Sequence, residues 1–174
     1  MPLPKLVMSE GSLETARRIP RKLCAFIALL IFIADQVSKQ VIKEAVPRGA
    51  VIPVLRGFFN ITHTENPGVA FSLFSSSPSP LKTFVLISLS AVLLAVVLFF
   101  FWRAQDMRWP TGLGLSLILG GAASNLADRI RYGKVVDFLD FYFRAYHWPT
   151  FNLADSAIVV GAGFLILDVL LSGS

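Results

Sequence analysis

Hydrophobic residues occur in four long runs along the chain, and more polar stretches separate them. The runs cover about residues 22–42, 83–102, 111–127 and 153–171. About 20 helical residues cross a hydrocarbon core of about 30 Å. The third run is shorter and rich in glycine and alanine, which allows close approach of helices in lipid. This pattern predicts an all-α membrane protein with four transmembrane helices and both termini on the same side.

The connections between the runs differ in their residue types. Residues 50–74 contain β-branched and aromatic runs interrupted by Pro53, Gly57 and the turn signal at residues 66–68, which predicts short strands. The connection 129–151 is aromatic and basic, and we expect it to lie along the membrane interface before the last helix. Residues 1–20 are polar and contain three prolines, which predicts a flexible tail before a single membrane domain, 21–174.

The composition supports a membrane protein and narrows its partners. Hydrophobic residues make up 55% of the chain and charged residues 16%, well below the share of about one quarter in soluble domains. The formal net charge is +5, but the basic residues flank apolar runs, which favours contact with lipid headgroups over nucleic acid. One cysteine, Cys24, excludes an intrachain disulfide and a cysteine-rich metal site, and the isolated His63 and His147 do not indicate a metal or cofactor.

The basic residues also bear on orientation. A cluster before the first run (Arg17, Arg18, Arg21 and Lys22) and the short 103–108 loop favour cytoplasmic termini. The other two connections carry basic residues as well, so a plain count does not decide the matter. With cytoplasmic termini, the unusual polar residues of the runs all fall near the outer membrane surface: Asp35, Lys39, Asn125, Asp128, Asn152 and Asp155. Such residues are costly in a membrane and often mark a functional site.

Most of these residues also have a structural explanation. Asp35 and Lys39 are four residues apart, so an ion pair on one helix face is the favoured interpretation. Asp128 ends a helix, where the dipole disfavours an anion, and the adjacent Arg129 and Arg131 can offset its charge. Asn152 and Asp155 suit the N-cap and N3 positions of the last helix, and local sequence alone favours a cap over catalysis.

Asp137 favours a catalytic interpretation of these acids. It lies in the apolar segment KVVDFLDF, 18 residues before Asp155, whereas Asp140 is interpreted as solvated or as a local partner. Two neighbouring acids cannot both ionise easily, so one keeps its proton while the other accepts a proton from water. That water can then attack a peptide carbonyl, which is the chemistry of an aspartyl hydrolase. No pairing of serine or cysteine with histidine competes with this arrangement.

Four motifs appear in register: DQVSK (35–39), ENPGVAFS (65–72), GGAASNLADRIRYGKVVDF (120–138) and FNLADSA (151–157). Through them the chain resembles the lipoprotein signal peptidases, the bacterial signal peptidase II family. The resemblance implies a four-span aspartyl peptidase of the bacterial inner membrane with a small extracytoplasmic β-rich cradle. Such enzymes need no cofactor and remove the signal peptide of a prolipoprotein before a diacylglyceryl-modified cysteine, near the outer membrane face.

The resemblance also implies roles for individual residues. It assigns catalysis to Asp137 and Asp155. Supporting or substrate-binding roles fall on Asn66, Gly68, Ala70, Asn125, Asp128, Arg129, Asn152, Ala154, Asp35 and Lys39. Pro67 stands where threonine or another small residue is expected and Ser124 replaces a common glycine, which bears on substrate preference. The implied partners are the lipid-modified precursor and membrane lipid, with the enzyme a monomer.

A proton-conducting protein or small transporter is the alternative, because acids within a membrane also form relays. A relay distributes its acids through the depth of the membrane. Asp168 is the other acid in the predicted last span, and it lies 13 residues, or about 20 Å along a helix, from Asp155. This gap favours the peptidase. A structural scaffold, the third possibility, gives Asp137 no role.

Overall fold

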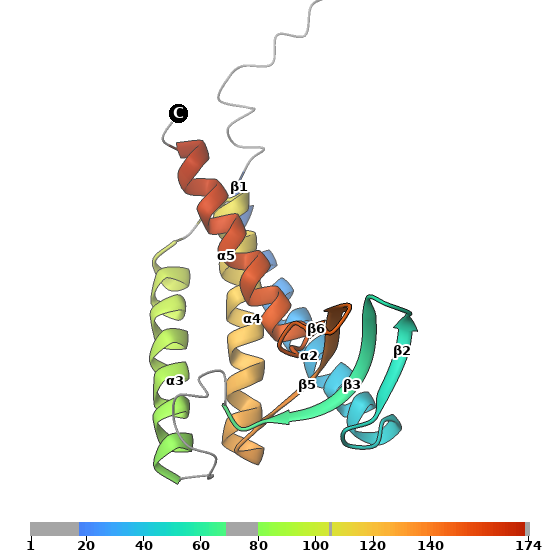
Figure 1. Ribbon diagram of the computed structural model, residues 1–174. Coiled ribbons are helices and arrows are strands. Elements are labelled where there is room, and N and C mark those ends of the chain that lie inside the picture. The colour runs from blue at the N-terminus through green and yellow to red at the C-terminus, as the bar shows by residue number, and fades with distance from the viewer. Residues whose placement is uncertain (1–17, 69–79, 105, 173–174) are drawn as a thin grey trace, which may run out of the picture.

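The computed structural model describes residues 18–68, 80–104 and 106–172, and within them long helices dominate (Figure 1). The helices are α2 (Arg21–Ala45), α3 (Pro80–Arg103), α4 (Trp109–Tyr132) and α5 (Leu153–Ser172). α4 packs against α2, α3 and α5 and so lies at the centre of the helical part. The predicted spans correspond to these four helices, although each helix extends beyond the predicted range.

Three of the helices are long and apolar enough to cross a membrane: Arg21–Ala45, Thr83–Arg103 and Leu153–Leu171. α4 has 24 residues, enough length to cross, but its glycine, serine and asparagine residues lower its hydropathy. Its central position explains this composition, because a helix that faces other helices does not need a lipid-facing apolar surface. α3 shows the opposite case, since only 6% of its most apolar window is buried.

A small antiparallel sheet lies beside one end of the helices, with the strand order β2-β3-β5-β6. The strands are β2 (Val51–Leu55), β3 (Phe59–Asn66), β5 (Val135–Phe143) and β6 (Tyr146–His147). The short strands predicted within residues 50–74 are therefore confirmed as β2 and β3, while residues 69–74 lie outside the described ranges. The connection 129–151, for which we predicted only an interfacial segment, instead supplies two strands of the sheet.

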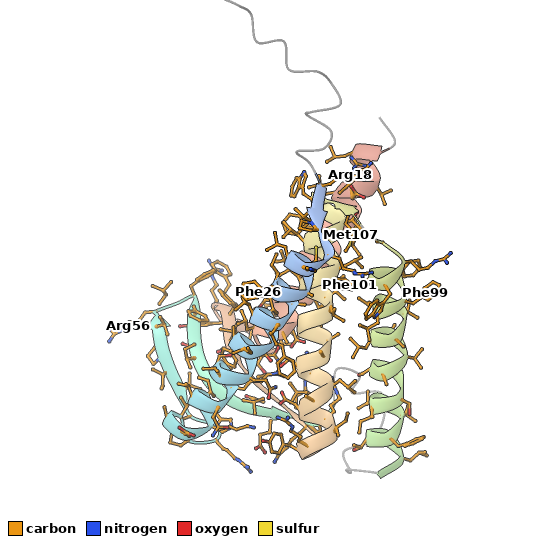
Figure 2. All side chains as sticks on the ribbon, turned by 180° about the vertical axis from the view of Figure 1, so that it is seen from behind. Arg18, Phe26, Arg56, Phe99, Phe101 and Met107 are labelled. Atoms are coloured by element: carbon orange, nitrogen blue, oxygen red, sulfur yellow. The ribbon has the colours of Figure 1, made fainter. Side chains whose placement is uncertain are left out.

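A second, two-stranded sheet changes the predicted start of the membrane domain. β1 (Arg18–Pro20) pairs antiparallel with β4 (Asp106–Arg108), at the end of the helices opposite the larger sheet. Residues 18–20, which we assigned to the tail, are thus part of the folded domain. Near this sheet an apolar cluster of Cys24, Phe101, Met107 and Leu115 joins α2, α3, β4 and α4. Two of its residues, Phe101 and Met107, are labelled in Figure 2.

A second apolar cluster joins the end of α2 to β5. It contains Ile42, Val46, Val136 and Phe138. This cluster holds the strand that carries Asp137 against the helices. Between it and the other cluster the interior is polar: Lys39, Asn152, Asp35 and Asp137 are the largest fully buried side chains among the described residues.

Candidate active site

Asp137 and Asp155 come from different elements and face the same cavity. Asp137 lies in β5, where Thr64 of β3 is its strand partner, and it is 1% exposed. Asp155 lies in the first turn of α5. Both line a cavity of about 790 Å³, whose wall also includes Asn66, Asn125, Arg129 and the apolar residues Phe151, Val159 and Val160. A cavity of this size, apolar with a few polar groups, is typical of a ligand site.

Asn152 connects the two acids. Its Oδ1 accepts a hydrogen bond of 2.9 Å from the backbone N–H of Asp155, which is an N-cap of α5. Its Nδ2 donates to Oδ1 of Asp137 at 2.7 Å. The cap expected from local sequence is therefore present, and the same side chain also contacts the second acid.

Two further asparagines orient the carboxylates. Asn125 Nδ2 donates to Oδ1 of Asp155 at 2.7 Å, and Asn66 Nδ2 donates to Oδ2 of Asp137 at 3.0 Å. Asn66 is itself held because its Oδ1 accepts from the backbone N–H of Gly68 at 2.8 Å. Gly68 has a φ of 91°, and a Cβ at this position would overlap the side chain of Leu86. The turn after β3 therefore requires glycine.

A buried ionic network lies beside the two acids. Lys39 Nζ is 2.6 Å from Oδ2 of Asp35 and 2.7 Å from Oδ2 of Asp128, and it donates to Oδ1 of Asn125 at 2.9 Å. The predicted pair of Asp35 and Lys39 is thus confirmed. The predicted partners of Asp128 are wrong, because Lys39 of α2 neutralises it in place of Arg129 or Arg131.

The network extends to the start of α5. Oδ1 of Asp35 accepts from the backbone N–H of Ala154 at 2.8 Å, so a carboxylate on α2 binds one of the amides that a helix leaves without an intrahelical partner. Ala154 itself is fully buried. This contact fixes the first turn of α5, and with it Asp155, against α2.

Arg129 lies in the cavity wall and makes few hydrogen bonds. Its Nη1 donates to the carbonyl oxygen of Asn125 at 3.4 Å, and its buried Nε has no hydrogen-bond partner among the described residues. Arg129 therefore places a guanidinium group in the wall of the cavity that Asp137 and Asp155 share. Ala70, the remaining residue expected at the site, lies outside the described residues.

The environment of Asp137 makes its carboxyl easier to protonate than usual. Its pKa is raised from 3.8 to about 6. Burial is the main cause; the hydrogen bond from Asn66 opposes the shift, and the neighbouring Asp155 carboxylate adds to it. An acid that titrates near neutral pH beside another acid suits proton transfer in both directions.

Gln36 and Ser124 belong to the buried network, although the sequence motifs indicated no such role for either residue. Gln36 Nε2 donates to Ser124 Oγ and to Oδ1 of Asp128, both at 2.9 Å, and Ser124 Oγ donates to Asp35 at 2.7 Å. These contacts join α2 to α4 around the buried ions. The available signal was an amide between Asp35 and Lys39 within an apolar span, which needs a polar partner in lipid.

Two acids outside the cavity have structural partners. Asp140 is 5% exposed and accepts from Asn60 Nδ2 at 2.7 Å, with the ring Nδ1 of His147 at 2.8 Å. It is therefore a partner within the sheet and not solvated. Asp168 of α5 accepts a hydrogen bond from Thr111 Oγ1 at 2.6 Å and lies 3.4 Å from Arg108 Nε. These contacts lie at the N-terminal end of α4, far from Asp155. Within the described ranges, no group of three or more His, Cys, Asp or Glu residues is suited to hold a metal.

Comparison with known proteins gives a consistent result. The family profile described as "Signal peptidase (SPase) II" matches residues 27–171. Lipoprotein signal peptidase of Solibacter usitatus is 46% identical over 144 residues, covering 83% of this chain and 88% of its own. That of Desulforapulum autotrophicum is 40% identical, covering 86% and 91%. A solved bacterial membrane enzyme superposes with a TM-score of 0.76 at 30% identity, covering 88% of this chain and 90% of its own.

Proposed function

Because the chain belongs to the signal peptidase II family, we propose that Asp137 and Asp155 are the catalytic pair with which it removes signal peptides from prolipoproteins. The observation that carries this assignment is the convergence of both carboxylates on one cavity, joined through Asn152. Among the described acids that the sequence singled out, Asp35, Asp128, Asp140 and Asp168 do not line this cavity, and each lies within 3.4 Å of a lysine, histidine or arginine side chain.

The pair shares one proton in the resting enzyme. The ionised carboxylate accepts a proton from a water molecule, and the water oxygen attacks the carbonyl carbon of the scissile bond. The protonated carboxyl donates to the carbonyl oxygen, so a neutral tetrahedral intermediate forms. Its collapse breaks the C–N bond, returns a proton to the pair and delivers another to the leaving amine. The raised pKa of Asp137 supports this cycle, because its carboxyl group binds and releases a proton close to neutral pH.

The asparagines position the acids, and Arg129 binds the substrate. Asn152 and Asn125 already use their side-chain groups on Asp137, Asp155 and Lys39. We therefore assign them to orientation of the carboxyls in preference to the substrate contact expected from sequence. Arg129, which lines the cavity, supplies guanidinium N–H donors for a substrate carbonyl oxygen. Val159 and Val160, exposed on the cavity side of α5, suit the apolar part of a lipid-modified precursor.

The enzyme crosses the membrane four times, with α4 as the additional span. Its length of 24 residues and its position among three apolar helices support this arrangement. The active site lies at the C-terminal ends of α2 and α4 and at the N-terminal end of α5, hence near one membrane surface. The basic cluster of Arg17, Arg18, Arg21 and Lys22 favours cytoplasmic termini, which makes this the extracytoplasmic surface of a bacterial inner membrane. We assign the protein as a monomer that acts on diacylglyceryl-modified precursors just before the modified cysteine.

The test is cleavage of a diacylglyceryl-modified prolipoprotein by the purified full-length protein. Asp137→Asn and Asp155→Asn are each expected to lower kcat by roughly 10³-fold or more, since each removes a group that exchanges a proton. Asp168→Asn is the matched control, because it removes an acid from the same helix as Asp155 but far from the cavity, and it should keep near-parent activity. Cleavage at a comparable rate by both dyad variants would overturn the assignment.

A further inference from the structure

A second cavity, of about 430 Å³, lies behind the sheet relative to the active site. Successive residues of a strand point to opposite faces, and here Thr64 and Asn66 line the first cavity while His63 lines the second. In β5, Asp137 likewise faces the first cavity and Val136 the second. Glu65 lines both cavities, so the second cavity adjoins the catalytic one across β3 and β5.

The charges that line this cavity are unbalanced. Its cations are Lys43, Arg48 and Lys134, and its one lining acid is Glu65. Glu65 contacts Arg48 at 2.7 Å and Lys134 at 2.6 Å, so it is shared between two cations. Lys43 Nζ instead lies 3.9 Å from the ring centroid of Tyr132. Three cations around one carboxylate leave an excess of positive charge that suits an anion.

A buried histidine in the cavity wall requires that the ligand also donates a hydrogen bond. His63 is 4% exposed, and its Nδ1 lies 2.7 Å from the carbonyl oxygen of Val46. A carbonyl only accepts, so Nδ1 carries the hydrogen and Nε2 of the neutral ring is an acceptor. Nε2 is buried without a hydrogen-bond partner among the described residues, which is costly. A ligand that combines an anion with a hydroxyl donor satisfies both the cations and His63.

The position of the cavity indicates that this ligand is a lipid. Lys43 lies in the last turn of α2, and Tyr132 ends α4, so the cavity lies where these two helices end. Tyr132, which itself lines the cavity, is 52% exposed. Tyrosine rings at helix ends are typical of the headgroup level of a membrane, and basic residues beside them attract anionic headgroups. Free phosphate has no apolar part that contacts the Tyr132 ring.

We propose that this cavity binds the headgroup of an anionic phospholipid of the phosphatidylglycerol type. Lys43, Arg48 and Lys134 surround the phosphodiester, and a headgroup hydroxyl donates to Nε2 of His63. Peptide cleavage does not require this site, so the inference is independent of the function proposed for Asp137 and Asp155. A lipid bound here holds the β3–β5 ladder at the membrane surface from the side opposite the substrate.

The experiment is native mass spectrometry of the full-length protein in a neutral detergent, titrated with phosphatidylglycerol. Lys43→Gln and Arg48→Gln should each weaken binding by about tenfold, the effect of one charge-assisted contact. Arg48 is 69% exposed on its side chain, so its replacement does not endanger folding. Arg56→Gln is the matched control, because Arg56 lies at the exposed tip of the β2–β3 hairpin, away from the cavity, and should bind as the parent does (Figure 2).

The comparison ligands separate the possible sources of binding. We expect phosphatidylmethanol, which lacks the hydroxyl, and diacylglycerol, which lacks the phosphate, to bind more weakly than phosphatidylglycerol, and inorganic phosphate to be displaced by it. Equal weakening by Arg56→Gln and Lys43→Gln would mean nonspecific attraction and overturn the proposal. Diacylglycerol binding as tightly as phosphatidylglycerol, or phosphate that the lipid does not displace, would overturn it as well.

Discussion

The side-chain amide of Asn152 donates a 2.7 Å hydrogen bond to the carboxylate of Asp137, which lies 15 residues earlier in the chain. The carbonyl oxygen of the same side chain caps α5 by accepting from the backbone N–H of Asp155. A helix cap and a contact to the proposed catalytic acid are thus properties of one residue. The geometry of the pair depends on where α5 begins.

Substitutions of Asn152 separate these two properties. Serine is as good an N-cap as asparagine, but its side chain is too short to reach Asp137 as well. We therefore expect Asn152→Ser to be about 1 kcal/mol more stable than Asn152→Ala, because serine keeps the cap while both variants lose the hydrogen bond to Asp137. Both should lower kcat at least tenfold, because Asp137 loses an orienting donor. Thermal unfolding in detergent and cleavage kinetics measure the two effects, and parent kcat in Asn152→Ser would contradict the positioning role.

The pH dependence of cleavage should report on Asp137. Its raised pKa, about 6, predicts a limb near pH 6 in kcat/KM, as an apparent value for the pair. The hydrogen bond from Asn66 stabilises the ionised form and so lowers this pKa. Asn66→Ala should therefore move the limb to higher pH, by roughly one unit for a charge-assisted hydrogen bond.

Asn60 provides the control for this measurement. It lies on the same strand as Asn66 but donates to Asp140, outside the cavity. Asn60→Ala should leave the limb where it is in the parent enzyme. A limb that shifts equally in both variants, or that moves to lower pH in Asn66→Ala, would show that another group titrates.

Local patterns predicted the contacts within one helix and missed those between elements. The pair of Asp35 and Lys39 follows from their spacing, and it is present at 2.6 Å. The partner of Asp128 was predicted wrongly, because Lys39 reaches it across α2 and α4, and the rotation of one helix against another is not encoded in a short motif. The strand around Asp137 was also missed, since its partner β3 lies about 70 residues away in sequence.

Lys39 should be the most sensitive residue of the buried network for stability. It lies between the carboxylates of Asp35 and Asp128, and Lys39→Met leaves two buried acids without their cation. Breaking a buried ion pair in this way costs about 3–5 kcal/mol. Neutralising both acids in the same chain, with Asp35→Asn and Asp128→Asn, should recover most of this loss, because no uncompensated charge then remains. Unfolding in detergent measures it, and a triple variant no more stable than Lys39→Met would contradict the electrostatic explanation.

Close packing of α4 on α5 should control the position of Asp155. A Cβ at Gly121 would come within 2.5 Å of the carbonyl oxygen of Ala154, the residue before Asp155. Gly121→Ala must therefore displace the first turn of α5, and displacements of about 1 Å at a catalytic group can lower the rate by about 10²-fold. The strain should also lower the free energy of unfolding by about 1–3 kcal/mol.

Gly163 allows this explanation to be tested against a general effect of adding a methyl group to a glycine-rich helix. It lies in α5 as well, and a Cβ there meets nothing within 4 Å. Gly163→Ala should keep the parent kcat, and its stability should rise slightly because alanine favours the helix by about 0.5–1 kcal/mol over glycine. Cleavage kinetics of the two variants, measured side by side, decide the matter. If Gly121→Ala cleaved as fast as Gly163→Ala, the contact between α4 and Ala154 would have no part in holding Asp155 in place.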